Sequence, residues 1–374
     1  MSEYQYYEFQ ALDKRLTPSE QDFINTLSSR VQLTPTTAIF TYSYSDFRGE
    51  PKDLLIRCFD IMLYIANWGT RQLMFRLPLS LVDLSALEEY SLPNVITIEV
   101  ISQYVVIDIL IDDEENSDWV EGEGWLSKLA RLRDDILQGD FRALYLAWLK
   151  AAPMLLDIKE IEEDAPEPAV PANLQNLSNP LQSLVEFFNI DQDLITAAAI
   201  NSCSSKKQEV SLEKYIPALS EAEKIDFLTR LIKDEPLVSV QLAKRLQELS
   251  KNNTRTINSE NTRRSLSELL TNAKNQTKIR QKQEAQAAKE AKIRRLEALA
   301  PKQDQIWKEV FRLIELKQAK PYDEAVAHLV DLRDLAEYQG KLSEFYPKIY
   351  QIENDYSKRS GLISRLAKVG LISR

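Results

Sequence analysis

The first candidate site is an acidic run, IDDEENSDWVEGEGW, whose carboxylate and amide oxygens could bind a metal ion. Counted from Asp112, oxygen-bearing side chains fall at five of the positions that bind Ca²⁺ in a 12-residue loop. They are Asp112, Glu114, Asn116, Asp118 and Glu123. Ser117 stands where such a loop needs glycine, and we expect a strand rather than a helix to enter it. A solvated acidic loop is therefore favoured over a metal site, and it could also attract a basic partner.

A second group of candidates lies in a basic segment that contains neither Gly nor Pro. Its cations could contact the phosphates of a nucleic acid: Lys274, Lys278, Arg280, Lys282, Lys292, Arg294 and Arg295. No aromatic residue lies among them to stack on bases. A solvated helix face is favoured, with nucleic acid or an acidic protein surface as the alternatives.

Other familiar chemistries lack the residues that they require. The chain has one histidine, His328, and two cysteines, Cys58 and Cys203, far apart in the sequence. These counts exclude multi-histidine metal sites and a disulfide framework. Eight scattered glycines form no phosphate-binding loop. We expect no catalytic residues and no cofactor, and an enzyme with a carboxylate or metal site in the N-terminal part is the alternative.

Charge is distributed unevenly along the 374 residues, although the net charge is −10. Residues 1–170 hold 14 basic and 30 acidic side chains, whereas residues 251–300 hold 12 and 5. This argues against a uniformly basic nucleic-acid binder. The most apolar stretch, Leu144–Leu156, contains Lys150 and Pro153 and is too short to span a bilayer. We expect a cytoplasmic protein that does not contact membranes.

The elements that would position these residues fall into an α+β N-terminal domain and an all-α C-terminal half with a long charged helix. Alternating and β-branched segments predict strands at 4–12, 36–42, 71–77, 95–101 and 104–111, in a mixed sheet. Apolar spacing predicts helices at 17–29, 54–67, 84–90, 125–137 and 141–149. We therefore assign residues 1–156 to the α+β head domain.

The remaining chain divides by composition. Residues 157–180 are rich in acids and proline and predict an extended linker. Residues 181–256 predict a small all-α unit, and residues 257–300 predict a long basic helix. Its apolar positions are interrupted from Lys274 to Glu284, which favours an exposed spacer over a weak homodimeric coiled coil. Residues 301–374 predict a helical hairpin or bundle.

Four segments resemble an uncharacterised bacterial protein family of cyanobacterial type. They read EYQYYEFQALDKRLT, IANWGTRQLMFRLP, DWVEGEGWLSKLARLRDDILQGDFRALYLAWL and ISRLAKVGL. The resemblance spans most of the chain, but the family has no assigned activity, so it implies no functional residues. We associate such proteins with neighbouring SWIM zinc-finger and helicase-like proteins, which implies membership of a nucleic-acid-associated complex.

Two folded ends, few chemically active residues and a charged helix together predict a non-catalytic adaptor or scaffold subunit of a bacterial cytoplasmic complex. Its partners would be other proteins, and it could form a homodimer through the long helix. The alternatives are a nucleic-acid-associated subunit that uses the basic helix and the carboxylate-based enzyme described above.

Overall fold

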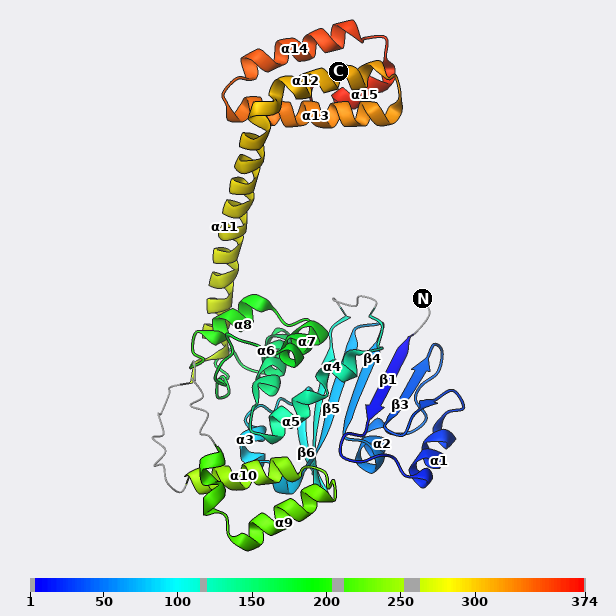
Figure 1. Cartoon of the computed structure of the whole chain (residues 1–374), viewed down its shortest axis with the longest axis vertical. Helices are drawn as coiled ribbons and strands as arrows, with labels where there is room; N and C mark the ends of the chain where they lie inside the picture. Colours follow the sequence, from blue (N-terminus) through cyan, green and yellow to red (C-terminus); the bar gives the residue numbers. More distant parts are fainter. Residues whose placement is uncertain (1–3, 115–119, 204–211, 252–262, 373–374) are drawn as a thin grey trace. The chain divides into compact units, whose positions relative to one another are not determined.

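The computed structural model describes residues 4–114, 120–203, 212–251 and 263–372 (Figure 1). The chain forms two compact units, Met1–Thr277 and Lys278–Arg374. The first holds the sheet and the second is helical, so the predicted fold class is confirmed.

Unit 1 is built on one seven-stranded sheet in the order β2-β3-β1-β4-β5-β7-β6. All its neighbouring strands run antiparallel, so the prediction of a mixed sheet was wrong. The strands are β1 (Gln5–Gln10), β2 (Gln32–Leu33), β3 (Thr37–Tyr42), β4 (Ile61–Ala66), β5 (Thr70–Pro78), β6 (Ile96–Ile101) and β7 (Tyr104–Asp112).

The segment 54–67 was predicted as one apolar helix, and this prediction was wrong. A short helix, α2 (Pro51–Cys58), ends within this segment, and β4 begins after two further residues. All six residues of β4 are buried, because its alternate side chains enter two different cores. A strand buried on both faces loses the polar alternation that distinguishes strands from helices in a sequence.

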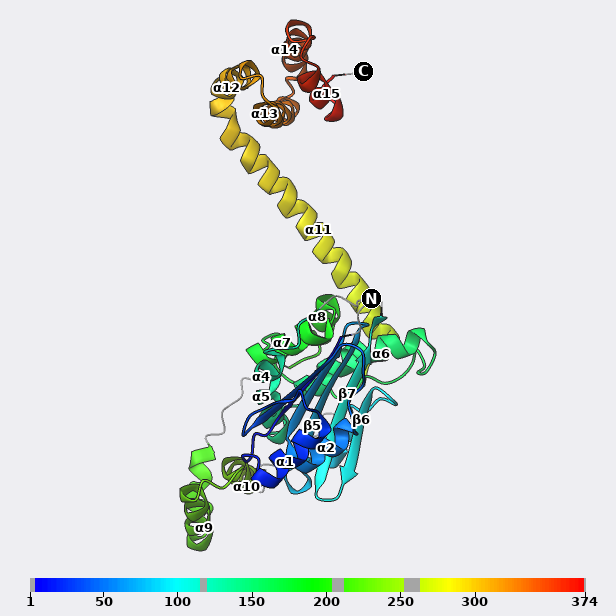
Figure 2. The ribbon, with the colours of Figure 1, turned by 90° about the vertical axis from the view of Figure 1, so that its right-hand side faces the viewer.

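Helices cover both faces of the sheet. The core on one face contains Phe9, Phe40 and Met62 and is closed by α1 (Pro18–Leu27) and α2. The opposite core is larger and is covered by helices, some of which lie together on one side of the sheet in Figure 2. They are α3 (Leu84–Glu88), α4 (Trp125–Leu129), α5 (Arg131–Leu137), α6 (Arg142–Asp157), α7 (Asn179–Phe188) and α8 (Gln192–Ala199).

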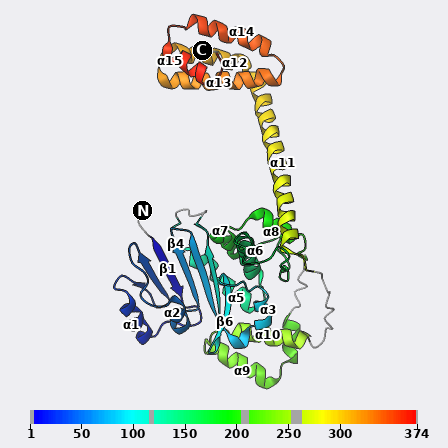
Figure 3. The same cartoon turned by 180° about the vertical axis from the view of Figure 1, so that it is seen from behind.

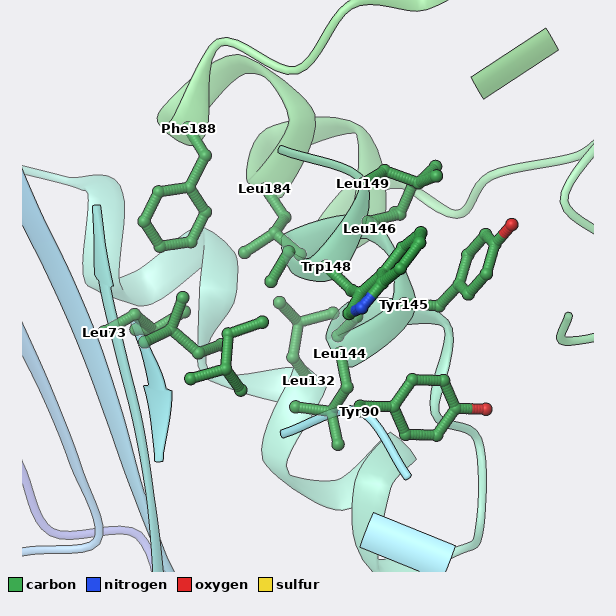
Figure 4. Close-up of a cluster of buried hydrophobic side chains, with 14 of the residues drawn as sticks. Leu73, Tyr90, Leu132, Leu144, Tyr145, Leu146, Trp148, Leu149, Leu184 and Phe188 are labelled. Atoms are coloured by element: carbon green, nitrogen blue, oxygen red, sulfur yellow. The ribbon is translucent and has the colours of Figure 1, made fainter. Parts of the chain in front are cut away.

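The larger core joins side chains from distant segments (Figure 4). Leu73 of β5 and Leu132 of α5 are fully buried, as are Leu144 of α6 and Leu184 of α7. The same core receives Leu266 and Leu269 from the first turn of α11 (Leu266–Leu299), a helix of 34 residues. The beginning of the long helix is therefore part of the body that contains the sheet.

Residues 157–180, which we predicted to be a linker, pack against this body. Leu174 is buried in the larger core, and Glu167 is 2% exposed. The Arg264 guanidinium donates to both carboxylate oxygens of Glu167 at 2.8 Å, and the Tyr145 hydroxyl also donates to Glu167. These bonds fasten the segment to the residues that precede α11.

Two helices and two 3₁₀ segments complete the described part of unit 1, and one further 3₁₀ segment lies in unit 2. Helix α9 (Glu221–Ile232) lies against α10 (Val238–Lys251) in Figures 1 and 3. The 3₁₀ segments are η1 (Leu79–Leu81), η3 (Leu212–Ala218) and η4 (Ala300–Lys302). Among the described residues, no helix is long and apolar enough to cross a membrane.

Unit 2 forms its own helical core. It contains α12 (Gln303–Glu315), α13 (Ala319–Tyr338), α14 (Leu342–Asp355) and α15 (Ser360–Lys368). Val310, Leu329 and Ile349 are fully buried at its centre. The long helix contributes ion pairs to this unit, because Arg295 contacts Asp331 at 2.6 Å and Lys292 contacts Asp334 at 3.0 Å.

Candidate protein-interaction surface

The predicted acidic loop begins at the end of β7. The Thr70 hydroxyl donates to Asp112 at 2.9 Å, and Glu114 and Glu123 are exposed. Asn116 and Asp118 lie outside the described residues. Within the described ranges, no group of three or more His, Cys, Asp or Glu residues is close enough to hold a metal ion.

The neighbouring Asp113, which was not among the predicted ligands, pairs with Lys150 at 2.5 Å. This pair joins the end of β7 to α6. Asp113 therefore stabilises the packing of α6 on the sheet.

The predicted phosphate-contacting residues all lie on α11, and the structure divides them into two groups. Four of them contact carboxylates: Arg280 contacts Glu284, Arg294 contacts Glu290, Lys292 contacts Asp334, and Arg295 contacts Asp331. The other three, Lys274, Lys278 and Lys282, are exposed and have no ion pair within the described part of the chain.

A buried network of four charged residues was not predicted from the sequence. Arg133 is 1% exposed and donates to Asp13 through two nitrogens, at 2.8 and 2.6 Å. Asp60 is also 1% exposed and accepts a bond of 2.7 Å from Arg76. The network joins the end of β1, the start of β4, β5 and α5. The spacing of these residues in the sequence gives no local signal of their contact.

The pKa values of the two carboxylates in this network are shifted in opposite directions. Burial would raise the pKa of Asp60, but Arg133 and Arg76 outweigh burial, and the pKa lies below its ordinary value. Burial raises the pKa of Asp13, and the bonds from Arg133 offset this effect incompletely. Two arginines balance two aspartates, so the cluster is suited to hold four elements together.

The cavities that the structure describes are small or open. The segment NWGTR, at the turn between β4 and β5, contributes Gly69 and Arg71 to a cavity of about 10 Å³ beside Phe188 and Asn189. This is room for about one water molecule. A second hollow, of about 360 Å³, is bordered by four residues of α11, Ser267, Glu268, Thr271 and Asn272. A single helix wall does not enclose a ligand.

Helix α9 presents its apolar side to solvent. Its exposed aliphatic residues are Ile225 (62%), Leu228 (60%), Leu231 (46%) and Ile232 (86%). We call these four residues the α9 face. None of the 12 residues of α9 is buried. No other helix in the described ranges carries four exposed large apolar side chains.

The opposite, polar side of α9 attaches the helix to α10. Glu223 accepts a bond of 2.9 Å from Arg245, and Arg230 donates to Gln241. The helix begins with a capping box in which Ser220 and Glu223 bond to each other's backbone N–H groups. An amphipathic helix normally buries its apolar stripe and exposes its charges. The reversed arrangement leaves the α9 face available to another molecule.

The sequence indicates the helix that carries this surface, but it does not show which side of the helix faces solvent. The apolar spacing of 221–232 is typical of a helix that packs on a core, and we predicted that this segment belongs to a small all-α unit without assigning it a function. Comparison of the chain with protein-family models, curated proteins and solved structures gave no match.

Proposed function

We propose that the protein is a non-catalytic adaptor that binds another protein through the α9 face. The exposed aliphatic side chains of this face carry the proposal. Covering them would contribute roughly 5 kcal/mol before the costs of association, at about 1.5–3 kcal/mol for each fully buried side chain. Contiguous exposed apolar patches of this kind are a feature of protein interaction sites.

The spacing of the α9 face indicates how the partner is shaped. Ile225, Leu228 and Ile232 stand at i, i+3 and i+7, the anchor spacing of a helix that binds in a hydrophobic groove. A standard interface uses roughly 20–30 residues on each side, which is more than the 12 residues of α9. Pairing of α9 with a second copy would therefore be small, whereas a groove encloses more of the helix. The proposed partner is a protein with an apolar groove.

A matched pair of variants tests this proposal. Leu228→Asp places a charge in the α9 face, and Ala222→Asp places the same charge about 120° around the helix from Leu228. Full-length wild type and both variants are purified from the native cells, and the proteins that accompany them are quantified by mass spectrometry. We expect one protein to accompany wild type and Ala222→Asp but to be depleted at least about tenfold with Leu228→Asp, a loss of about 1.4 kcal/mol.

The groove is then tested with the recovered partner in purified form. Calorimetry should show 1:1 binding to wild type and weaker binding to Leu228→Asp, with a negative heat-capacity change that reports apolar burial. Circular dichroism checks that Leu228→Asp remains folded, as expected for a residue that is 60% exposed. Equal recovery of every partner with all three proteins contradicts the proposal.

A further inference from the structure

Three lysines of α11 lie along one side of the helix within unit 2. Lys278, Lys282 and Lys289 are separated by four and then seven residues, which correspond to about one and two turns. Their side chains therefore point within about 40° of one another and cover about 17 Å of helix length. All three are exposed. We call these residues the lysine stripe.

The acids of this part of α11 lie away from the stripe and are already paired. Glu284 contacts Arg280 at 3.0 Å, and Glu290 contacts Arg294 at 3.7 Å. These pairs, at i and i+4, support the helix. Among the residues of unit 2 that the structure describes, the stripe lysines have no ion pair. Their charges are therefore available to an external anion.

We propose that the lysine stripe binds the phosphate backbone of duplex nucleic acid without reading its sequence. A duplex carries one charge per about 1.7 Å of its length, and lysines that contact phosphates release condensed counterions. A straight row of point charges fits this linear polyanion. Helix α11 has no aromatic residue between Leu266 and Leu299, so it lacks the stacking groups that favour single strands.

The charge of each unit sets the conditions under which binding occurs. Unit 2 has 20 basic and 14 acidic residues, whereas unit 1 has 27 and 43. The net charge of unit 2 attracts a polyanion, and that of unit 1 repels it. Binding is therefore expected at low ionic strength and should weaken steeply as salt is added.

Fluorescence anisotropy of a labelled 30-base-pair DNA duplex, titrated with the full-length protein, measures this binding. Three phosphate contacts predict that log K falls with log salt with a slope of about −2.7, which is about a 40-fold loss between 50 and 200 mM salt. Lys278→Gln/Lys282→Gln/Lys289→Gln should bring the slope close to zero. A duplex of unrelated sequence should bind within about twofold of the first.

A control variant removes the same charge from other exposed positions of unit 2. Lys308→Gln/Lys320→Gln/Lys358→Gln should keep the wild-type slope. The proposal is overturned if wild type does not bind at 25 mM salt, or if both triple variants lose the slope equally. It is also overturned if polyglutamate, at equal charge, displaces the labelled duplex better than unlabelled duplex does, because an acidic protein surface would then be the better ligand.

Discussion

Arg133 and Asp13, which are 120 positions apart in the sequence, form a two-bonded ion pair inside unit 1. The same guanidinium approaches Asp60 at 3.4 Å and donates to the backbone carbonyl of Arg76 at 2.9 Å. One side chain of α5 thereby contacts the end of β1, the start of β4 and β5. Removing it takes both side-chain donors from Asp13, whereas Asp60 keeps Arg76 and the backbone N–H groups of Leu12 and Asp13.

Arg133→Met should therefore destabilise unit 1 by about 3–5 kcal/mol, because breaking a buried pair leaves an uncompensated charge. Lys14→Met is the matched control, since Lys14 pairs with Glu20 at 3.2 Å but is 55% exposed, and it should cost under about 1 kcal/mol. Urea denaturation followed by circular dichroism measures both changes. Equal destabilisation by the two variants would contradict a structural role for the network.

Acid should weaken the contribution of Asp60. Its pKa is lowered in the folded protein, because Arg133 and Arg76 outweigh the opposing effect of burial. An aspartate in the unfolded chain has a pKa near 3.9, so the unfolded state takes up a proton first as the pH falls. The stabilisation is therefore complete well above pH 4 and is lost as the pH falls through the folded-state pKa.

The comparison of wild type with Asp60→Asn tests this effect together with a change at Asp13, because the Asp60 carboxylate is one of the causes that raise the pKa of Asp13. The difference in unfolding free energy between the two proteins should be largest at pH 7 and should shrink below about pH 4. Urea denaturation at several pH values measures it. A difference that stays constant from pH 3 to pH 7 would refute the prediction.

Gly69→Ala should be more costly than an ordinary glycine substitution. Gly69 has a φ of +106°, and a Cβ atom there would lie 2.3 Å from the backbone oxygen of Asp113. Gly139 also has a positive φ, +81°, but a Cβ atom would meet nothing within 4 Å. We expect about 1 kcal/mol for Gly139→Ala and at least about 3 kcal/mol for Gly69→Ala. Thermal unfolding of the two variants separates the steric cost from the conformational one.

Leu269→Ala should destabilise unit 1, although residue 269 belongs to the helix that continues into unit 2. Leu269 is fully buried in the larger core, and truncating such a residue costs about 2–5 kcal/mol. Ile200→Ala, at a position that is 63% exposed, should cost under about 1 kcal/mol. Calorimetry should show a lower melting temperature for the unit 1 transition with Leu269→Ala alone. No shift would place the start of α11 outside that core.

The sequence predicted the elements that carry an unambiguous local pattern. Thr17, Pro18 and Glu20 signalled the start of α1, and the hairpin of β6 and β7 turns at Ser102, as expected from its β-branched flanks. It did not predict β4, because the continuous apolar run 61–66 has neither helical nor strand periodicity. Local patterns therefore determined the fold class, whereas burial on two faces had to be seen in the structure.

The candidate sites were predicted less completely, for a related reason. The exposed lysines of α11 follow from composition, since a helix rich in charge stays in solvent. The Asp13–Arg133 contact depends on residues far apart in the chain, which no spacing rule connects. The direction of the α9 face depends on whether Glu223 or Ile225 faces α10, and both orientations satisfy the same helical pattern.

The order of the strands has a consequence for synthesis on the ribosome. Strand β1 emerges first but lies between β3 and β4, and the core beneath the sheet also takes Leu266, Leu269 and Ala273 from α11. A nascent chain that ends before these residues leaves part of that core uncovered. Such intermediates expose apolar surface and are prone to aggregate, so we infer that unit 1 reaches its final packing late in translation.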